Sequence, residues 1–273
     1  RGRALQSSAL RQVQAMSATT SAAEPLLRVL RTACRLPLLA WQVLVNLPIM
    51  LFLIGIDTIG GKKVGHAAIR WWAGGLLWVF GMRVRRTGTP LPGGTMFVAN
   101  HLGWVDIVVL HSQHMMGLIA KAEIRGWPLI GWLARAGESI FLQRGNAHSL
   151  AGVMAEMAQR LRDGHAVGVF PEAGTRDGRE LGPFHARIFT AAVEADAPVQ
   201  PVALCFGQRC EAQQIVAFGP GENFLANFVR LLGEPVRPMK VCFLEPILHA
   251  EHEGRRRIAT LARARIEQAM AAA

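Results

Sequence analysis

Apolar residues form two long stretches in the first third of the chain and short, regularly spaced runs in the rest. The first stretch holds 21 residues without a charge, from Leu36 to Ile56, and the second holds 12, from Trp71 to Met82. A helix needs about 20 residues to cross the hydrocarbon core of a bilayer. Only the first stretch is therefore long enough to span a membrane.

Prolines and polar residues interrupt this first stretch, and basic residues flank both of its ends. We therefore expect it to be an irregular membrane segment. A single span would leave one basic cluster on the wrong face, and Gly60–Gly61 supplies a turn before the second stretch. We therefore expect residues 24–82 to form a helical hairpin that enters one leaflet, with tryptophans at interfacial depth. The alternatives are a single span and a buried core helix followed by an amphipathic one. Residues 1–23 are polar and unpatterned, which predicts a disordered tail.

From residue 83 onward, runs typical of strands alternate with amphipathic runs typical of helices. The expected strands cover residues 83–88, 96–99, 116–120, 139–142, 166–170, 199–206, 215–218 and 241–244. The expected helices cover residues 105–111, 124–136, 186–195 and 255–270, with another between residues 146 and 163. This alternation predicts an α/β domain over residues 83–273, in which helices flank a mostly parallel sheet with room for antiparallel edges.

Charge narrows the range of partners. The chain has 30 Lys and Arg against 19 Asp and Glu, a net charge of +11. Such a chain calls for an anionic partner, which can be nucleic acid, an anionic lipid surface or an acidic carrier protein. The hydrophobic content of 51% favours a membrane-associated protein, and no RNA-binding, zinc-finger or helix-turn-helix signature is present. We therefore expect anionic membrane lipids, and no nucleic acid, among the partners.

The cysteines and histidines lack the spacing of a metal site. His111 and His114 form an H-x-x-H pair, but two ligands three residues apart hold no metal without further ligands. We expect no metal at Cys205 and Cys210 for the same reason. No cysteine belongs to a C-x-x-C pair, so all four are interpreted as small apolar residues of a reducing compartment: Cys34, Cys205, Cys210 and Cys242.

Candidate chemistry begins at the end of the apolar run 96–99, where His101 is followed five residues later by Asp106. On one continuous helix, side chains five residues apart point in different directions. If His101 lies on the turn after the strand and Asp106 in the first turn of the next helix, the carboxylate can accept from imidazole Nδ1. Nε2 is then free to take a proton. By itself, such a pair is more often a structural contact than a catalytic one.

Three later segments extend this pattern: GESIFLQR at residues 137–144, FPEAGTR at residues 170–176 and APVQPV at residues 197–202. Together with the His101–Asp106 pair, they resemble in order and separation the four sequence blocks of the glycerolipid acyltransferase family, of the 1-acyl-glycerol-3-phosphate acyltransferase type. The resemblance covers roughly residues 75–250. Four blocks in the right order rarely arise by chance.

The resemblance implies a role for each block. His101 would act as the general base, oriented by Asp106, in acyl transfer from a thioester to an alcohol. Arg144 and Arg176 each follow an expected strand and would bind the phosphate of the acceptor, which a guanidinium group can hold through two hydrogen bonds. Exposed surface charges are the simpler interpretation of both arginines. The remaining residues of the third block would shape the glycerol site: Glu172, Gly174 and Thr175.

Two features qualify this assignment. Lys121, at the end of an expected strand, either assists phosphate binding or is a surface lysine. The family usually has Phe-Pro-Glu-Gly-Thr in the third block, whereas this chain has Ala173 inserted between Glu172 and Gly174. We keep the catalytic assignment, because one extra loop residue can bulge without moving its neighbours. The insertion bears instead on which acceptor is bound.

The resemblance therefore implies an enzyme that acylates the free hydroxyl of a lysophospholipid, foremost 1-acyl-sn-glycerol-3-phosphate to give phosphatidic acid. The donor would be acyl-CoA or acyl-carrier protein as co-substrate, with no separate cofactor. No G-x-S-x-G elbow is present, which argues against a covalent acyl-enzyme. The alternatives are O-acylation of another lyso-lipid, such as lyso-ornithine lipid, and a non-catalytic lipid-binding protein. We expect the protein at the cytoplasmic face of the inner membrane, attached by its hairpin or by one N-terminal span.

Overall fold

The computed structural model describes residues 23–60, 63–143, 147–172, 174–248 and 254–273. Within these residues, seven strands form one sheet in the order β1-β7-β6-β2-β5-β3-β4. Their bounds are β1 Met82–Thr87, β2 Met96–Ala99, β3 Gly117–Lys121, β4 Ile140–Leu142, β5 Val167–Val169, β6 Val199–Phe206 and β7 Arg237–Phe243. This confirms the predicted α/β class with a mostly parallel sheet.

Strands β6, β2, β5, β3 and β4 are parallel to one another, and β7 and β1 at the other end of the sheet run in the opposite direction. Strand β7 pairs antiparallel with β6, and β1 pairs parallel with β7. The antiparallel pairing therefore lies inside the sheet rather than at its edge. Because β2, β3, β4 and β5 are parallel, the segments that follow them leave the same edge of the sheet. That edge is where open α/β sheets bind ligands.

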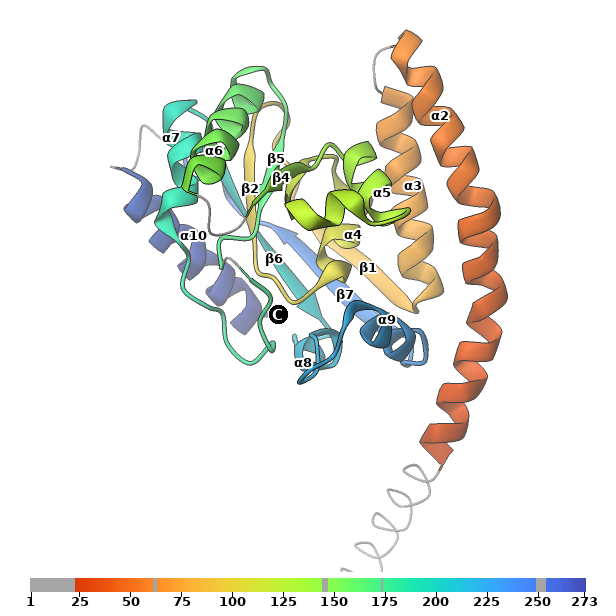
Figure 1. Cartoon of the computed structure of the whole chain (residues 1–273). Helices are drawn as coiled ribbons and strands as arrows, with labels where there is room; N and C mark the ends of the chain where they lie inside the picture. The colour runs from red at the N-terminus through yellow and green to blue at the C-terminus, as the bar shows by residue number, and fades with distance from the viewer. Residues whose placement is uncertain (1–22, 61–62, 144–146, 173, 249–253) are drawn as a thin grey trace, which may run out of the picture.

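Helices cover both faces of the sheet (Figure 1). Strand β2 shows how the two faces divide, because Phe97 and Ala99 pack into one apolar cluster while Met96 and Val98 pack into the other. The first cluster includes side chains of α3 Lys63–Val79, α4 Trp104–Gln113 and α9 Phe224–Leu232. The second includes side chains of α6 Ala147–Arg162, η3 Ala186–Phe189, α7 Thr190–Glu194 and α10 Gly254–Ala271.

The chain N-terminal to the sheet is helical. Residues 23–41 continue through the π-helical turn η1 Gln42–Asn46 into α2 Leu47–Gly60, which packs against α3. By length and composition, helix Ala23–Ile56 is the one described helix that could cross a membrane. Of its most apolar part, 17% is buried within the protein. Most of this segment is therefore exposed, unlike the helix of a buried core, which was one of the expected alternatives. The expected tail lies, apart from Ala23, outside the described residues.

This long helix is fastened to the α/β domain next to α9 (Figure 1). Arg35 is buried and donates to the carbonyl oxygens of Leu232 and Glu234 at 2.8 and 2.7 Å. The Arg28 guanidinium lies 2.8 Å from a Glu234 carboxylate oxygen. Large apolar side chains elsewhere on the helix remain exposed, for example Leu44 at 73% and Phe52 at 68%.

Three predictions of secondary structure need correction. Residues 215–218, expected as a strand, overlap the short helix α8 Gln213–Val216, whose Gln213 side chain bonds back to the end of β6. Helix α9 was not expected, although Asn223 caps it through a bond from Ala226 N. The expected helix 124–136 is broken into η2 Ala122–Gly126 and α5 Ile130–Ala136, as the proline at 128 allows.

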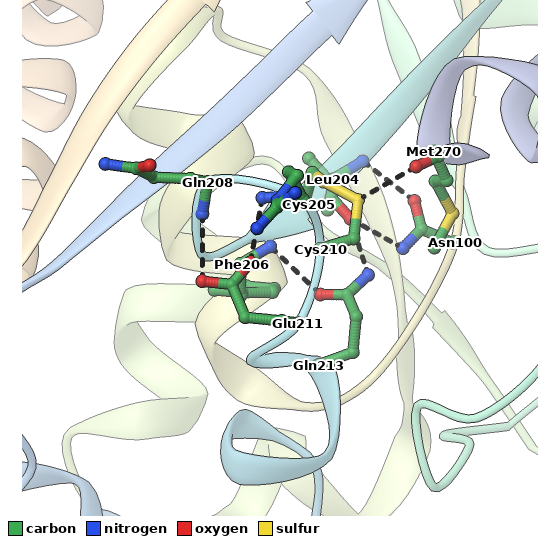
Figure 2. The surroundings of a disulfide bond; sticks show 10 residues. Asn100, Leu204, Cys205, Phe206, Gln208, Cys210, Glu211, Gln213 and Met270 are labelled. Atoms are coloured by element: carbon green, nitrogen blue, oxygen red, sulfur yellow. Dashed lines mark hydrogen bonds between the residues drawn. A yellow bond between two sulfur atoms is a disulfide. The ribbon is translucent and has the colours of Figure 1, made fainter. Parts of the chain in front are cut away.

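The interpretation of all four cysteines as unpaired is wrong for two of them. Cys205, near the end of β6, and Cys210, in the turn that follows, form a disulfide (Figure 2), and their Cα atoms lie 4.6 Å apart. The turn closes because Gly207 and Cys210 adopt positive φ angles of 91° and 60°. Cys34 and Cys242 are free.

Candidate active site

His101 and Asp106 meet as the sequence predicted. His101 lies in the turn after β2, and Asp106 lies in the first turn of α4. His101 Nδ1 lies 2.9 Å from Asp106 Oδ2, and the Asp106 side chain is fully buried. The same oxygen accepts from the amides of Leu102 and Gly103 at 2.5 and 2.9 Å. A carboxylate held this way keeps a proton on Nδ1 and leaves Nε2 as an acceptor.

A stacking contact also restrains the face of the His101 ring. Phe170, which follows β5, stacks on it with ring centroids 3.9 Å apart and an interplanar angle of 14°. The His101 side chain is 15% exposed. An imidazole that is restrained in plane and in tautomer, and that remains partly exposed, is suited to accept a proton from a bound hydroxyl.

Glu172 connects the third block to the first. Its Oε1 accepts from the His101 amide at 3.0 Å, and its Oε2 accepts from the Gly182 amide at 2.8 Å. The side chain is almost completely buried, and burial raises the pKa of its carboxyl, while the two amides and the Arg176 charge act in the opposite direction. Both carboxylate oxygens are thus occupied by backbone amides that fix the shape of the site.

Arg176 is the basic group that the structure brings next to His101. Its amide donates to the His101 carbonyl oxygen at 3.0 Å, and its Nε lies 3.5 Å from Glu172 Oε2. The Arg176 side chain is 42% exposed, so its guanidinium group can also reach a ligand. Gly174 and Thr175 lie in the short connection between Glu172 and Arg176, where Gly174 is half-buried and Thr175 is exposed.

Two further residues were predicted for the site, and the structure describes one of them. Arg144, like the inserted Ala173, lies outside the described residues. Lys121 ends β3, two strands away from β2, and its Nζ pairs with Glu123 at 3.3 Å with 47% of the side chain exposed. Such an exposed ion pair contributes little stability, and its partner reduces the charge that Lys121 could offer to a phosphate.

Several residues that support the site were missed from sequence. Asn100 is buried beside His101, and its side chain both donates to and accepts from the backbone of Leu204, at 3.0 and 2.8 Å (Figure 2). Trp104 donates to Asn227 at 2.9 Å and packs against Phe224 and Phe228 of α9. A buried asparagine at a strand end must find hydrogen-bond partners. The position of Asn100 directly after the apolar run 96–99 could therefore have predicted a structural role for it.

The histidine pair after Asp106 serves packing. His111 Nε2 lies 3.2 Å from the Met116 carbonyl oxygen, and burial lowers the pKa of the His111 ring. The ring of His114 packs against Phe97. Across the described ranges, no three His, Cys, Asp or Glu side chains gather where they could hold a metal ion.

Comparison with known proteins places this geometry in a family. A family model described as Acyltransferase matches residues 83–205. The chain is 33% identical over 178 residues to a lyso-ornithine lipid O-acyltransferase of Pseudomonas aeruginosa, covering 65% of this chain and 69% of the relative. It is 32% identical over 176 residues to a 1-acyl-sn-glycerol-3-phosphate acyltransferase of Neisseria gonorrhoeae, covering 64% and 67%.

The fold has a counterpart among solved structures. The crystal structure of the 1-acyl-sn-glycerophosphate acyltransferase of Thermotoga maritima superimposes with a TM-score of 0.73 at 17% identity, covering 90% of this chain and 96% of that one. The family match includes the His101–Asp106 pair and the third block with Glu172 and Arg176. The chain is therefore a member of the acyltransferase family.

Proposed function

We propose that this acyltransferase esterifies the free hydroxyl of a lyso-lipid, with 1-acyl-sn-glycerol-3-phosphate as the leading acceptor and phosphatidic acid as its product. The observation that carries the proposal is the His101 Nδ1 to Asp106 Oδ2 contact of 2.9 Å, which leaves Nε2 to act as a base. The donor is an acyl thioester of coenzyme A or of acyl-carrier protein. The donor carries the acyl group itself, so the reaction needs no cofactor.

The chemistry follows from the position of one proton. The acceptor hydroxyl gives its proton to His101 Nε2 while its oxygen attacks the thioester carbonyl carbon, which forms the new C–O bond. Asp106, held by two backbone amides, stabilises the imidazolium that results. The tetrahedral intermediate then expels the thiolate, the C–S bond breaks, and the imidazolium returns a proton to the sulfur. No acyl-enzyme is required.

The acceptor's negative headgroup is bound by a guanidinium group. Arg176 is bonded to His101 through the backbone, and its side chain is 42% exposed, which supports its assignment to the headgroup of an acceptor bound at His101. A phosphate offers two oxygens to such a fork. We also assign phosphate contact to Arg144, and contact with the glycerol portion to Gly174 and Thr175. Lys121 would contribute to phosphate binding only after leaving Glu123.

A second acceptor is favoured by a specific observation. The relative from Pseudomonas aeruginosa is named for lyso-ornithine lipid and is as similar to this chain as the relative named for 1-acyl-sn-glycerol-3-phosphate. The inserted Ala173 falls in the block assigned to acceptor binding. An ornithine headgroup presents a carboxylate rather than a phosphate, and an arginine fork binds either group. Family membership argues against the non-catalytic lipid-binding alternative.

We place the protein at the cytoplasmic face of the inner membrane, where both thioester donors and lyso-lipids are present. Residues 24–82 would hold it there as a hairpin in one leaflet or with a single span. Exposed apolar side chains of the long helix support this location, as do Trp71 and Trp78 on α3, which are 50% and 54% exposed. Arg83 lies over the Trp78 ring at 5.0 Å, an arrangement suited to the lipid headgroup region.

A transfer assay tests the proposal. The purified protein is incubated with labelled acyl-CoA or acyl-carrier protein and a panel of lyso-lipids with phosphate, zwitterionic and ornithine headgroups. We expect transfer to 1-acyl-sn-glycerol-3-phosphate above every other acceptor. Transfer to lyso-ornithine lipid alone would replace the leading acceptor by the second one, and transfer to no lyso-lipid would refute the proposal.

A further inference from the structure

Arg263, on the C-terminal helix α10, forms hydrogen bonds to the loop that follows the third block. Its Nη2 donates to the Leu181 carbonyl oxygen at 2.8 Å, and its Nε donates to the Gly182 carbonyl oxygen at 3.0 Å. The guanidinium is steadied from the other side by Glu267, one turn along α10, at 2.9 Å. A planar fork that is already held by a carboxylate loses little freedom when it binds two adjacent carbonyls.

Gly182 connects Arg263 to the residues of the active site. Its amide donates to Glu172 Oε2 at 2.8 Å, so the residue is held through both its amide and its carbonyl. A Cβ on Gly182 would lie 2.6 Å from Arg176 Nε, which means that the Arg176 guanidinium rests directly on the glycine backbone. One residue therefore contacts Arg263, Glu172 and Arg176 together.

The loop that contains Gly182 has no regular secondary structure. The described residues from 174 to 185 form no helix or strand, so secondary structure does not fix the position of Gly182. Segments without such support open locally at low cost unless side chains restrain them. The Arg263 fork supplies two charge-assisted hydrogen bonds to neighbouring carbonyls in this segment, and α10 itself is anchored in the apolar core through Ile258, Ala262 and Ile266.

We infer that Arg263 is a positioning residue of the active site. By fixing Gly182, it holds the Glu172 carboxylate against the His101 amide and keeps the Arg176 guanidinium beside the acceptor's headgroup. Arg263 does not touch the reacting atoms. This inference rests on the proposed function, since it assigns Arg176 to the acceptor and His101 to the proton transfer.

The inference predicts an effect on both kinetic constants. In Arg263→Ala, Gly182 is no longer held through its carbonyl, so Arg176 loses the surface it rests on and KM for the anionic acceptor rises. Glu172 loses a firm partner on one oxygen, which loosens the His101 amide and lowers kcat. We expect kcat/KM to fall at least about tenfold. Arg263→Lys, which can bond one of the two carbonyls, should recover part of this loss.

Arg265 is a matched control on the same helix. Its Nη1 donates to the Glu245 carbonyl oxygen at 2.7 Å, so Arg265→Ala also removes an arginine-to-carbonyl bond from α10, but at a place away from Glu172 and Arg176. The two alanine variants are compared for kcat, KM and Tm. A similar Tm with a tenfold loss only in Arg263→Ala supports the inference. Kinetics of Arg263→Ala equal to those of Arg265→Ala would overturn it.

Amide hydrogen exchange tests the clamp, meaning the fixing of Gly182 by Arg263, without a measurement of enzyme activity. The amides of Gly182 and His101 both bond to Glu172, so both should exchange faster in Arg263→Ala than in the parent protein or in Arg265→Ala. Unchanged protection of both amides would refute the clamp, whatever acceptor the enzyme uses. Failure of the parent protein to acylate any lyso-lipid, with faster exchange in the variant, would instead refute the proposed function and leave the clamp in place.

Discussion

The amide of Arg176 donates a hydrogen bond to the carbonyl oxygen of His101 at 3.0 Å, which ties the third sequence block to the first through the backbone alone. Glu172 repeats the tie through its side chain, which accepts from the His101 amide. Both backbone groups of His101 are thus bonded to the third block. The site is one assembly in which the position of the base and that of the basic side chain depend on each other.

Asp106→Asn should abolish most of the activity without unfolding the protein. The asparagine oxygen, in the place of Asp106 Oδ2, can still accept from the amides of Leu102 and Gly103 and from His101 Nδ1, but it carries no charge. It therefore holds the ring less firmly in the tautomer that leaves Nε2 free and does not stabilise the imidazolium, so we expect kcat to fall by roughly 10³-fold with KM little changed. Steady-state kinetics beside a Tm measurement checks this. A kcat within a factor of five of the parent value would contradict the orienting role.

Arg176→Ala should raise KM for anionic acceptors by about tenfold or more, because the exposed guanidinium no longer binds the headgroup. Arg179 provides the control, since it lies in the same loop, is 73% exposed and pairs only weakly with Asp177 at 3.5 Å. Arg179→Ala should leave KM unchanged. Equal KM values for the two variants would remove the assigned role of Arg176.

Glu172→Gln should change how stability depends on pH. Burial raises the pKa of the Glu172 carboxyl in the folded protein above the ordinary value of a glutamate, so the folded state holds this proton more tightly than the unfolded chain does. The stabilising effect of the proton is complete below the unfolded pKa and is lost as pH rises through the folded pKa. The parent protein should therefore lose stability relative to Glu172→Gln as pH rises through that window.

This comparison is made by unfolding both proteins at a series of pH values. His101 and Arg176 are the charged or titratable side chains that act on Glu172, and both are present in each protein, so the difference isolates the carboxyl. Parallel stability curves would show that the pKa of Glu172 is not raised in the folded state.

Exposed apolar residues of the long helix should govern membrane attachment. Leu44→Glu and Phe52→Glu place charges at positions that are 73% and 68% exposed, so folding tolerates them while insertion into hydrocarbon does not. We expect the double variant to bind vesicles at least about tenfold more weakly. Ala155→Glu, which adds a charge to the exposed face of α6, is the control. Equal vesicle binding by all three proteins would place the membrane contact elsewhere.

Local features of the site could be predicted because they lie within one strand, one turn and one helix. The apolar run 96–99, followed by His101 and then Asp106, is enough to indicate that the two side chains meet. The order of the later blocks indicates that Arg176 returns to the same edge of the sheet. These contacts need only strand directions, which the βα alternation supplies.

Contacts between distant segments could not be predicted. Nothing in the sequence around Arg263 distinguishes it from the other arginines of a basic helix, and its bonds to Leu181 and Gly182 depend on how α10 packs on the sheet. The Cys205–Cys210 disulfide depends on backbone angles in a turn rather than on a recognisable spacing. The strand expected at 215–218 failed because a short apolar run fits either helix or strand.

The base function of His101 is the central claim, and the acyl-transfer rate of His101→Ala tests it most directly. The variant leaves Asp106 with its two backbone donors, so the fold should persist, as a Tm close to that of the parent protein would show. With the acceptor that the parent protein prefers, we predict that kcat falls by at least about 10³-fold. A variant that keeps its fold and transfers acyl groups within tenfold of the parent rate would contradict the account.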